Sequence, residues 1–166
     1  MSIISSIKQK LIDTFYPKHI KCICCKDELS TKNVYDMCTH CYKTLPLIKY
    51  NFCVRCGLQF DKDGSGTCLN CKANNFSFEL ARSALNFDKA VVNFIHQFKY
   101  ARYKFLAEPL SYLLYDTLIL QDWKIDLISY VPLHPKREKD RGYNQSRELA
   151  TNLSKLSNIE VFHNIE

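Results

Sequence analysis

The sequence lacks the features that mark membrane-spanning, secreted and disordered chains. No run approaches the roughly 20 consecutive apolar residues that a transmembrane helix needs. The N-terminus carries no continuous apolar segment followed by a small-residue cleavage site, so no signal peptide is expected. Apolar residues make up 46% of the chain and aromatic residues 13%, which excludes an intrinsically disordered protein. We therefore expect a folded, cytoplasmic protein with no membrane span.

Glycine is scarce as well, with four residues in a chain of 166. Loops that cradle phosphate through exposed backbone amides depend on closely spaced glycines. The nearest imitation is Asp63-Gly64-Ser65-Gly66, which lies between cysteine pairs and is typical of a turn. The net charge of +6 is compatible with polyanion ligands, although it is lower than that of a dedicated DNA-binding tail.

Cysteine, by contrast, is abundant and regularly spaced. Nine cysteines in a chain without a secretory signal favour metal binding over disulfides. Eight of them form four C-x2-C pairs, in which two thiolates can converge on one ion, and a second pair completes a tetrahedron. The predicted ligands are Cys22, Cys25, Cys38, Cys41, Cys53, Cys56, Cys68 and Cys71.

These pairs predict two structural Zn²⁺ sites in a double zinc ribbon over residues 20–75. The connectors of 12 residues (26–37) and 11 residues (57–67) favour pairing of consecutive motifs, with an interleaved arrangement as the alternative. Iron–sulfur or redox chemistry is the competing interpretation of the cysteines. Cys24 is out of phase with the pairs and is interpreted as a spare thiol.

The chain on either side of the ribbon has helical and strand patterns. In residues 1–19, apolar residues spaced three and four apart predict an amphipathic helix that docks on the protein's own body, or else lies on a membrane surface. Residues 76–166 form the second predicted domain. Helices are expected after Asp88 and over 107–121, a strand or hairpin over 77–87, and a buried strand over 127–131.

One stretch of this second domain alternates basic residues with tyrosines. Such a pattern can bind single-stranded nucleic acid by contacting phosphates and stacking bases. The alternative is a helix surface with amphipathic tyrosines. The candidate contacts are Lys99, Tyr100, Arg102 and Tyr103.

Residues 128–150 contain a second basic segment. Pro132 and Pro135 end the predicted strand, a basic loop follows, and Asn144 is a plausible cap for the next helix. A helix N-terminus preceded by arginine and lysine favours anions, because free amide groups and the helix dipole act on the same spot. The alternative is a solvated basic loop.

The same stretch resembles the signature of the ComF family. The matching residues are Val-Pro-Leu-His at 131–134, Arg137, Arg-Gly-Tyr-Asn-Gln-Ser at 141–146 and Leu-Ala at 149–150. ComF proteins are bacterial competence-related proteins that join a cysteine-rich zinc module to a type I phosphoribosyltransferase-like domain. The resemblance implies an α/β fold, in which an N-terminal double zinc ribbon is followed by a parallel-sheet phosphoribosyltransferase-like domain.

The resemblance also implies a ligand, phosphoribosyl pyrophosphate with Mg²⁺. Its pyrophosphate would be bound by Arg137, Arg141, Gly142, Asn144 and Gln145, to which the local chemistry adds Lys139. Enzymes of this type hold the ribose with two adjacent acidic residues followed by a glycine-containing loop, and the sequence contains no such stretch. The domain is therefore expected to be incomplete and inactive alone as a glycosyltransferase. The two alternatives are a fragment of a longer protein, or a decayed or split copy that needs a second chain to complete its sheet.

Three hypotheses about function follow. The first is a ComF-like competence protein that binds phosphoribosyl pyrophosphate. The second is a non-catalytic module that handles single-stranded DNA, together with DNA-uptake proteins, during natural transformation. The third is a structural or degenerate product without a ligand.

Overall fold

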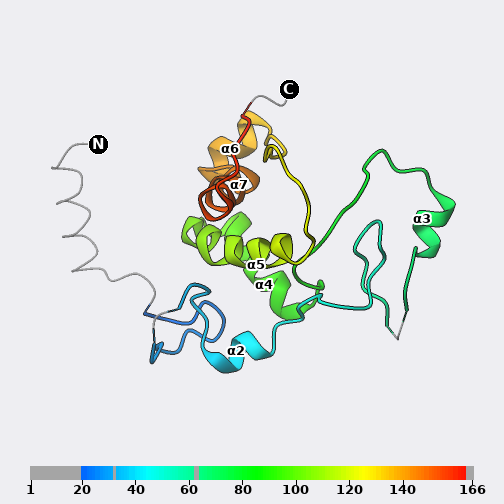
Figure 1. Cartoon of the computed structure of the whole chain (residues 1–166). Coiled ribbons are helices and arrows are strands. Elements are labelled where there is room, and N and C mark those ends of the chain that lie inside the picture. The colour runs from blue at the N-terminus through cyan, green and yellow to red at the C-terminus, as the bar shows by residue number, and fades with distance from the viewer. Residues whose placement is uncertain (1–19, 32, 62–63, 164–166) are drawn as a thin grey trace.

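The computed structural model describes residues 20–31, 33–61 and 64–163 (Figure 1). The amphipathic helix predicted for the first residues lies outside them. Helices are the only regular secondary structure of the described residues, and none of them is long and apolar enough to cross a membrane. Its helices are α2 (Thr39–Lys43), α3 (Leu69–Ala73), α4 (Lys89–Tyr100), the 3-10 turn η1 (Lys104–Leu106), α5 (Ala107–Ile119), α6 (Pro135–Arg141) and α7 (Gln145–Ser157).

The predicted α/β fold with a parallel-sheet phosphoribosyltransferase-like domain is wrong for the described residues. These residues form no strand or sheet, and their β-pairing is limited to isolated bridges. The apolar segment 127–131 pairs only through Ile128, which bridges Val161 in parallel. Leu127 and Val131 remain 53% and 75% exposed. An apolar run becomes a strand only where neighbouring segments pair along it and cover its faces, and here one residue is paired.

The basic segment expected to be a loop is also different, because residues 135–141 form helix α6. Pro135 occupies its first turn, where the missing N–H costs nothing. His134 caps the helix by accepting a hydrogen bond from the Lys136 N–H at 3.3 Å. Gly142 ends it with φ +87°, a left-handed conformation that glycine adopts without strain.

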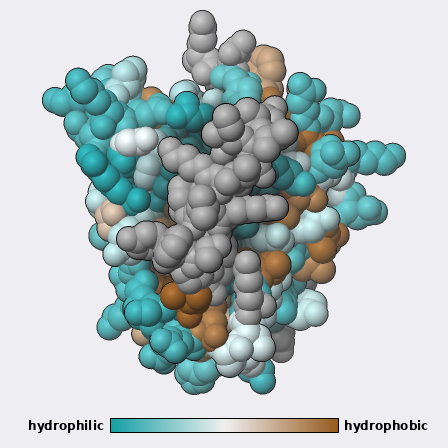
Figure 2. Space-filling model, turned by 90° about the vertical axis from the view of Figure 1, so that its left-hand side faces the viewer, coloured by the Kyte–Doolittle hydropathy of each residue, from teal (hydrophilic) through white to brown (hydrophobic). Residues whose placement is uncertain are grey.

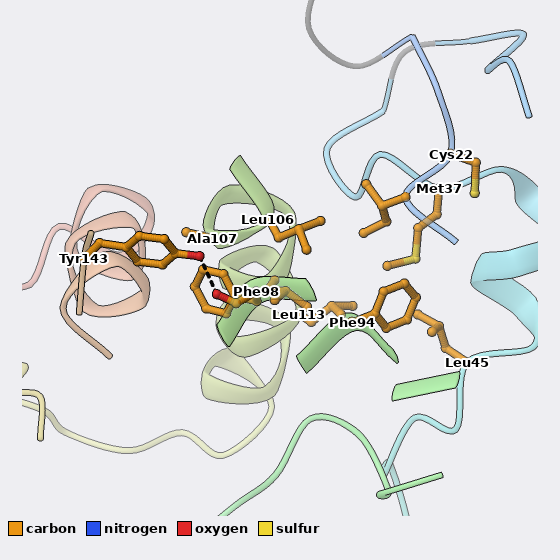
Figure 3. Close-up of a cluster of buried hydrophobic side chains, with 11 residues drawn as sticks. Cys22, Met37, Leu45, Phe94, Phe98, Leu106, Ala107, Leu113 and Tyr143 are labelled. Carbon is orange, nitrogen blue, oxygen red and sulfur yellow. Dashed lines mark hydrogen bonds between the residues drawn. The ribbon is translucent and has the colours of Figure 1, made fainter. Parts of the chain in front are cut away.

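The core joins the first zinc ribbon to the helices, as Figure 3 shows. Residues of the first ribbon pack against Phe94 and Phe98 of α4, and the cluster continues through Leu106 to Tyr143. The Tyr143 hydroxyl donates to the carbonyl oxygen of Phe98, so the α6–α7 turn is fastened to the end of α4. The ribbon residues in the cluster are Cys22, Ile23, Met37 and Leu45.

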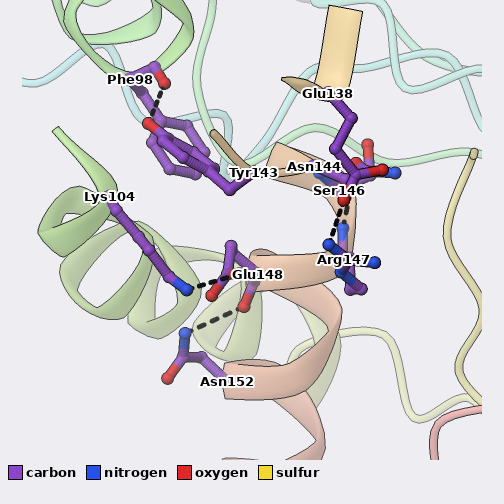
Figure 4. A network of polar contacts seen from close by, with 9 residues as sticks. All are labelled: Phe98, Lys104, Glu138, Tyr143, Asn144, Ser146, Arg147, Glu148 and Asn152. Atoms are coloured by element: carbon purple, nitrogen blue, oxygen red, sulfur yellow. Dashed lines mark hydrogen bonds and ion pairs between the residues drawn. The ribbon is translucent and has the colours of Figure 1, made fainter. Parts of the chain in front are cut away.

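Helices α5 and α7 pack together beside this core (Figure 1). The buried Ser111 hydroxyl lies 2.6 Å from the Ala107 carbonyl oxygen in its own helix and 3.3 Å from that of Leu149 in α7. Lys104 pairs with Glu148 at 2.8 Å, and Arg147 pairs with Glu138 (Figure 4). Figure 2 shows the face on the left of Figure 1, where hydrophilic residues cover much of the visible surface.

Two helix caps expected from the sequence are present. The Asp88 carboxylate accepts from the Val91 N–H at 2.9 Å and begins α4. The Asn144 side chain accepts from the Ser146 and Arg147 N–H groups at 2.9 and 3.3 Å and begins α7. Its amide nitrogen also donates to the Val131 carbonyl oxygen at 3.1 Å. Asn144 is therefore a buried structural residue that connects α7 to the 127–131 segment.

We predict that Asn144→Ala destabilises the chain by about 1–2 kcal/mol, since it removes both the cap and the donor to Val131. Urea denaturation followed by circular dichroism measures this change. Asn144→Ser is the matched control, because a serine hydroxyl can retain the cap and lacks the donor to Val131. Equal losses in the two variants would contradict the assigned role of the cap.

Candidate metal centres and basic pocket

The eight paired cysteines form two groups of four. In each group the sulfur atoms lie within 4.8 Å of one another, as tetrahedral coordination of one ion requires. Consecutive C-x2-C pairs share a group, so the interleaved arrangement is not formed. The first group is Cys22, Cys25, Cys38 and Cys41, and the second is Cys53, Cys56, Cys68 and Cys71.

Backbone N–H groups donate to two sulfurs in each group, and those of Cys41 and Cys71 reach the Sγ atoms of Cys38 and Cys68 at 3.4 Å. The Cys38 N–H donates to Cys22 Sγ at 3.3 Å, and the Cys68 N–H donates to Cys53 Sγ at the same distance. Burial raises the pKa of these two thiols, but the backbone donors outweigh it and lower each pKa to about 6. Each site therefore holds one thiolate in place before a metal binds.

The remaining thiols show why a cation belongs in each group. Burial and a hydrogen bond with Cys38 raise the pKa of Cys41 to about 12. Burial and a hydrogen bond with Cys56 raise the pKa of Cys71 to about 12. Four thiolates at this separation repel one another strongly unless a cation neutralises them. The donor set and its spacing thus fit Zn²⁺, and the structure supports two structural zinc sites.

The two ribbons are structural copies of each other. The bridge between Lys21 and Glu28 recurs 31 residues later between Phe52 and Gln59. The Cys22 N–H donates to the Asp27 carbonyl, and its counterpart at Cys53 donates to the Leu58 carbonyl, each at 2.8 Å. Both turns have one residue in the left-handed region, which is Lys26 in the first ribbon and Gly57 in the second.

The copies differ in what surrounds them. Ile23 in the first ribbon is 4% exposed in the main core, whereas its counterpart Val54 is 49% exposed. The second ribbon has its own small cluster, and its Gly57 approaches the backbone at 81–82 so closely that a Cβ would lie 2.9 Å from the Ala81 oxygen. The neighbouring Arg82 makes further contacts: its guanidinium lies 4.8 Å from the ring centroid of Phe52 and 5.6 Å from that of Trp123.

Cys24 stands apart from both groups. Its sulfur is not among the four that converge in the first ribbon, and its counterpart in the second ribbon is Arg55. Burial, followed by the charge of Cys22, raises its pKa to about 12. Cys24 therefore lies beside the first group without belonging to it.

The two predicted ligand-binding segments meet at one pocket of about 380 Å³. Residues of the α4 C-terminus line one side and residues of α6 line the other. The lining residues are Lys99, Tyr100, Arg102, Arg137, Asp140 and Arg141. The sequence named most of these residues in two separate hypotheses, and the fold brings them together.

Side-chain contacts join the two sides of this basic pocket. The Arg141 guanidinium lies 5.3 Å from the ring centroid of Tyr100. The Arg102 guanidinium donates to the Asp140 carbonyl oxygen at 3.0 Å, so both arginines are held at the junction. Gln145 is buried and accepts a hydrogen bond from Arg141.

Other predicted contacts lie outside the pocket lining. Lys139 and Tyr103 do not line it, and the ring of Tyr103 packs against Phe105 at 5.3 Å. Gly142 ends α6, and Asn144 caps α7. Of the predicted pyrophosphate contacts, two arginines therefore line the pocket, Gly142, Asn144 and Gln145 lie at the turn between α6 and α7, and Lys139 does neither.

One residue near this site was missed in the sequence. The Lys26 ammonium, in the first ribbon, lies 6.0 Å from the ring centroid of Tyr103 and donates to the side chain of Gln97 at 3.2 Å. The signal that would have revealed it is the 31-residue repeat, which aligns Lys26 with a glycine in a left-handed turn.

Comparison with known proteins supports the ribbon. Residues 11–72 match the double zinc ribbon domain family. No curated protein and no solved structure matches the chain.

We predict that both zinc ions are retained at neutral pH and released in acid, because protons compete with Zn²⁺ for the thiolates of each group. In the metal-free fold the pKa of Cys22 and Cys53 is lowered from 9.0 to about 6, so the stability that these two thiolates contribute is lost as the pH falls through about 6. Bound Zn²⁺ keeps the thiolates ionised to lower pH, so release should occur below that value. Elemental analysis after dialysis measures the zinc content.

The matched control for this experiment is Cys24→Ser, which should retain two zinc ions with the same pH dependence. Loss of one zinc ion in this variant, or release from the unmodified chain at neutral pH, would contradict the assigned ligands.

Proposed function

We propose that the chain is a zinc-stabilised module that binds single-stranded nucleic acid at the basic pocket. The double zinc ribbon braces the helical part, and the pocket supplies the binding surface. The observation that carries the proposal is the convergence of the α4 C-terminus and α6, two basic segments that are distant in the sequence, on one pocket.

Charge supports a phosphate-bearing ligand. Lys99, Arg102, Arg137 and Arg141 supply four cationic side chains to the pocket lining, against the single carboxylate of Asp140. Fixed arginines suit phosphate because the guanidinium presents several donors in one plane. A backbone phosphate that enters between the two segments would meet cations on both sides.

Aromatic residues support a nucleic acid over a simple anion. Tyr100 lies in the pocket lining and is 68% exposed, so part of its ring is accessible to a base. Tyr103 and Phe105 are 39% and 56% exposed and lie close by in sequence. Exposed aromatic rings interleaved with cations are the combination with which proteins hold unpaired bases regardless of sequence. Bases in a duplex are already stacked, so we infer a preference for single strands.

A second candidate is phosphoribosyl pyrophosphate with Mg²⁺, the ligand that the resemblance to ComF implies. Its support is the pair Arg137 and Arg141, which lie one helical turn apart in the pocket lining. Asn144 and Gln145 are engaged in the cap and in holding Arg141, which leaves fewer groups for a pyrophosphate. We therefore place single-stranded nucleic acid first. Natural transformation is the process that the same resemblance suggests.

We predict that Lys99→Ala and Arg141→Ala weaken the binding of a fluorescent oligothymidine. Each lost phosphate contact should also make the log–log dependence of affinity on salt shallower by about 0.7. Fluorescence anisotropy over a salt series measures both effects. The matched control is Lys49→Ala, since Lys49 is exposed and lies outside the pocket lining.

Two results would decide against this assignment. Equal effects of Lys99→Ala and Lys49→Ala would show that only net charge matters. The second candidate is favoured if the chain binds oligothymidine weakly and phosphoribosyl pyrophosphate with Mg²⁺ displaces it. Free Mg²⁺ alone should not displace it.

We predict separately that Tyr100→Ala costs about 1–3 kcal/mol of binding free energy if a base stacks on its ring. The salt dependence should stay unchanged, because no phosphate contact is removed. Tyr50→Ala is the control, as Tyr50 is 78% exposed and does not line the pocket. An unchanged affinity in Tyr100→Ala would remove stacking from the proposal.

A further inference from the structure

Lys26 has a backbone conformation that its side chain does not favour. Its φ is +68°, in the left-handed region, and it occupies the turn just after the first C-x2-C pair. The second ribbon has Gly57 at the equivalent position, with φ +73°. Glycine adopts this conformation freely, whereas a residue with a Cβ loses free energy there. The unfavourable backbone conformation of Lys26 therefore indicates that its side chain makes contacts that offset this cost.

The side chain joins the zinc turn to α4. The ammonium donates to the Ile23 carbonyl oxygen at 2.8 Å, inside the first C-x2-C pair. It also donates to the Gln97 side-chain oxygen at 3.2 Å, and it lies 6.0 Å from the Tyr103 ring centroid. One lysine thus contacts the first metal-binding turn and both ends of residues 97–103.

Gln97 is also the residue that closes the end of α4. Its carbonyl oxygen accepts from the N–H of Ala101 at 3.1 Å and from that of Tyr103 at 3.5 Å. Arg102 lies between these two donors in the left-handed region, with φ +59°. This turn directs Arg102 to the Asp140 carbonyl oxygen, across the basic pocket. The geometry of the pocket therefore depends on the turn that Gln97 closes.

The second ribbon has no comparable connection to the pocket within the described residues. Gly57 has no side chain, and the contacts of this ribbon lead instead to the backbone at 81–82 and to Trp123. Its Arg55 donates to the Phe76 carbonyl oxygen at 2.7 Å and lies near the rings of Phe76 and Phe78. The two zinc centres are alike in geometry but differ in the residues that surround and contact them.

We propose that Lys26 is a positioning residue through which the first zinc centre, and not the second, sets the turn at the end of α4 and so controls the basic pocket. Binding of Zn²⁺ fixes the turn that contains Lys26. The ammonium then contacts the Gln97 side chain and the Tyr103 ring, on either side of Arg102. The consequence for ligand affinity rests on the proposed binding of single-stranded nucleic acid, whereas the structural coupling does not.

The experiment compares the zinc-loaded full chain with Lys26→Gly. Glycine suits the left-handed turn, so this variant should fold and retain both zinc ions. Hydrogen exchange followed by mass spectrometry should show faster exchange in peptides covering 97–104. Affinity for oligothymidine should fall by about two- to thirtyfold, the range of couplings carried by such contacts, with an unchanged salt dependence.

A second comparison separates the two zinc centres. Cys25→Ser, in the first ribbon, should accelerate exchange over 97–104, whereas Cys56→Ser, in the second, should leave these peptides as they are. Lys26→Gly keeps the test valid if Cys25→Ser fails to fold, because it alters no metal ligand.

Three further results would decide against the inference or against the proposed function. Exchange over 97–104 that is equal in Lys26→Gly and the unmodified chain would overturn the inference. A salt dependence that becomes shallower by about 0.7 in Lys26→Gly would also overturn it, because Lys26 would then contact a phosphate directly. If the unmodified chain does not bind oligothymidine, the proposed function fails, and the exchange data still decide whether the coupling exists.

Discussion

The rest of the structure depends on the binding of a cation by each of the two groups of four cysteines. Sulfur atoms within 4.8 Å of one another cannot all carry charge without a cation between them. Backbone donors lower the pKa of Cys22 and Cys53, whereas burial raises the pKa of Cys41 and Cys71. The ribbons contain little apolar material of their own, so the metal–thiolate bonds supply the cohesion that a hydrophobic core supplies elsewhere.

In the first ribbon, this metal-dependent unit is also part of the main core. Cys22 is fully buried, and Ile23 and Met37 beside it pack against Phe94 and Phe98 of α4. Phe98 then receives the Tyr143 hydroxyl at its carbonyl oxygen, which places the α6–α7 turn. The basic pocket lies at the end of this chain of contacts. Its shape is therefore a property of the whole packed unit and not of either basic segment alone.

The sequence predicted the parts of the structure that local chemistry determines. The spacing of the cysteines favoured the consecutive pairing that forms the two sites, and Asp88 and Asn144 were identified as caps because short polar side chains satisfy free N–H groups. The strand predicted at 127–131 does not form, because an apolar run has no preference of its own for a sheet without paired neighbours. Helix α6 was missed because two prolines were interpreted as a loop, although Pro135 occupies the one turn that tolerates it.

Sequence patterns did not predict the basic pocket or the different surroundings of the two ribbons, for a different reason. Residues 99–102 and 137–141 meet only because α4, α5 and α7 pack around one core, and no local signal encodes that meeting. Likewise, Ile23 and Val54 are equivalent and similarly apolar, yet one is buried and the other half-exposed. The repeat makes two metal centres of the same geometry. The two centres differ in the residues that their ribbons contact, which are Gln97 for the first and Ala81 for the second.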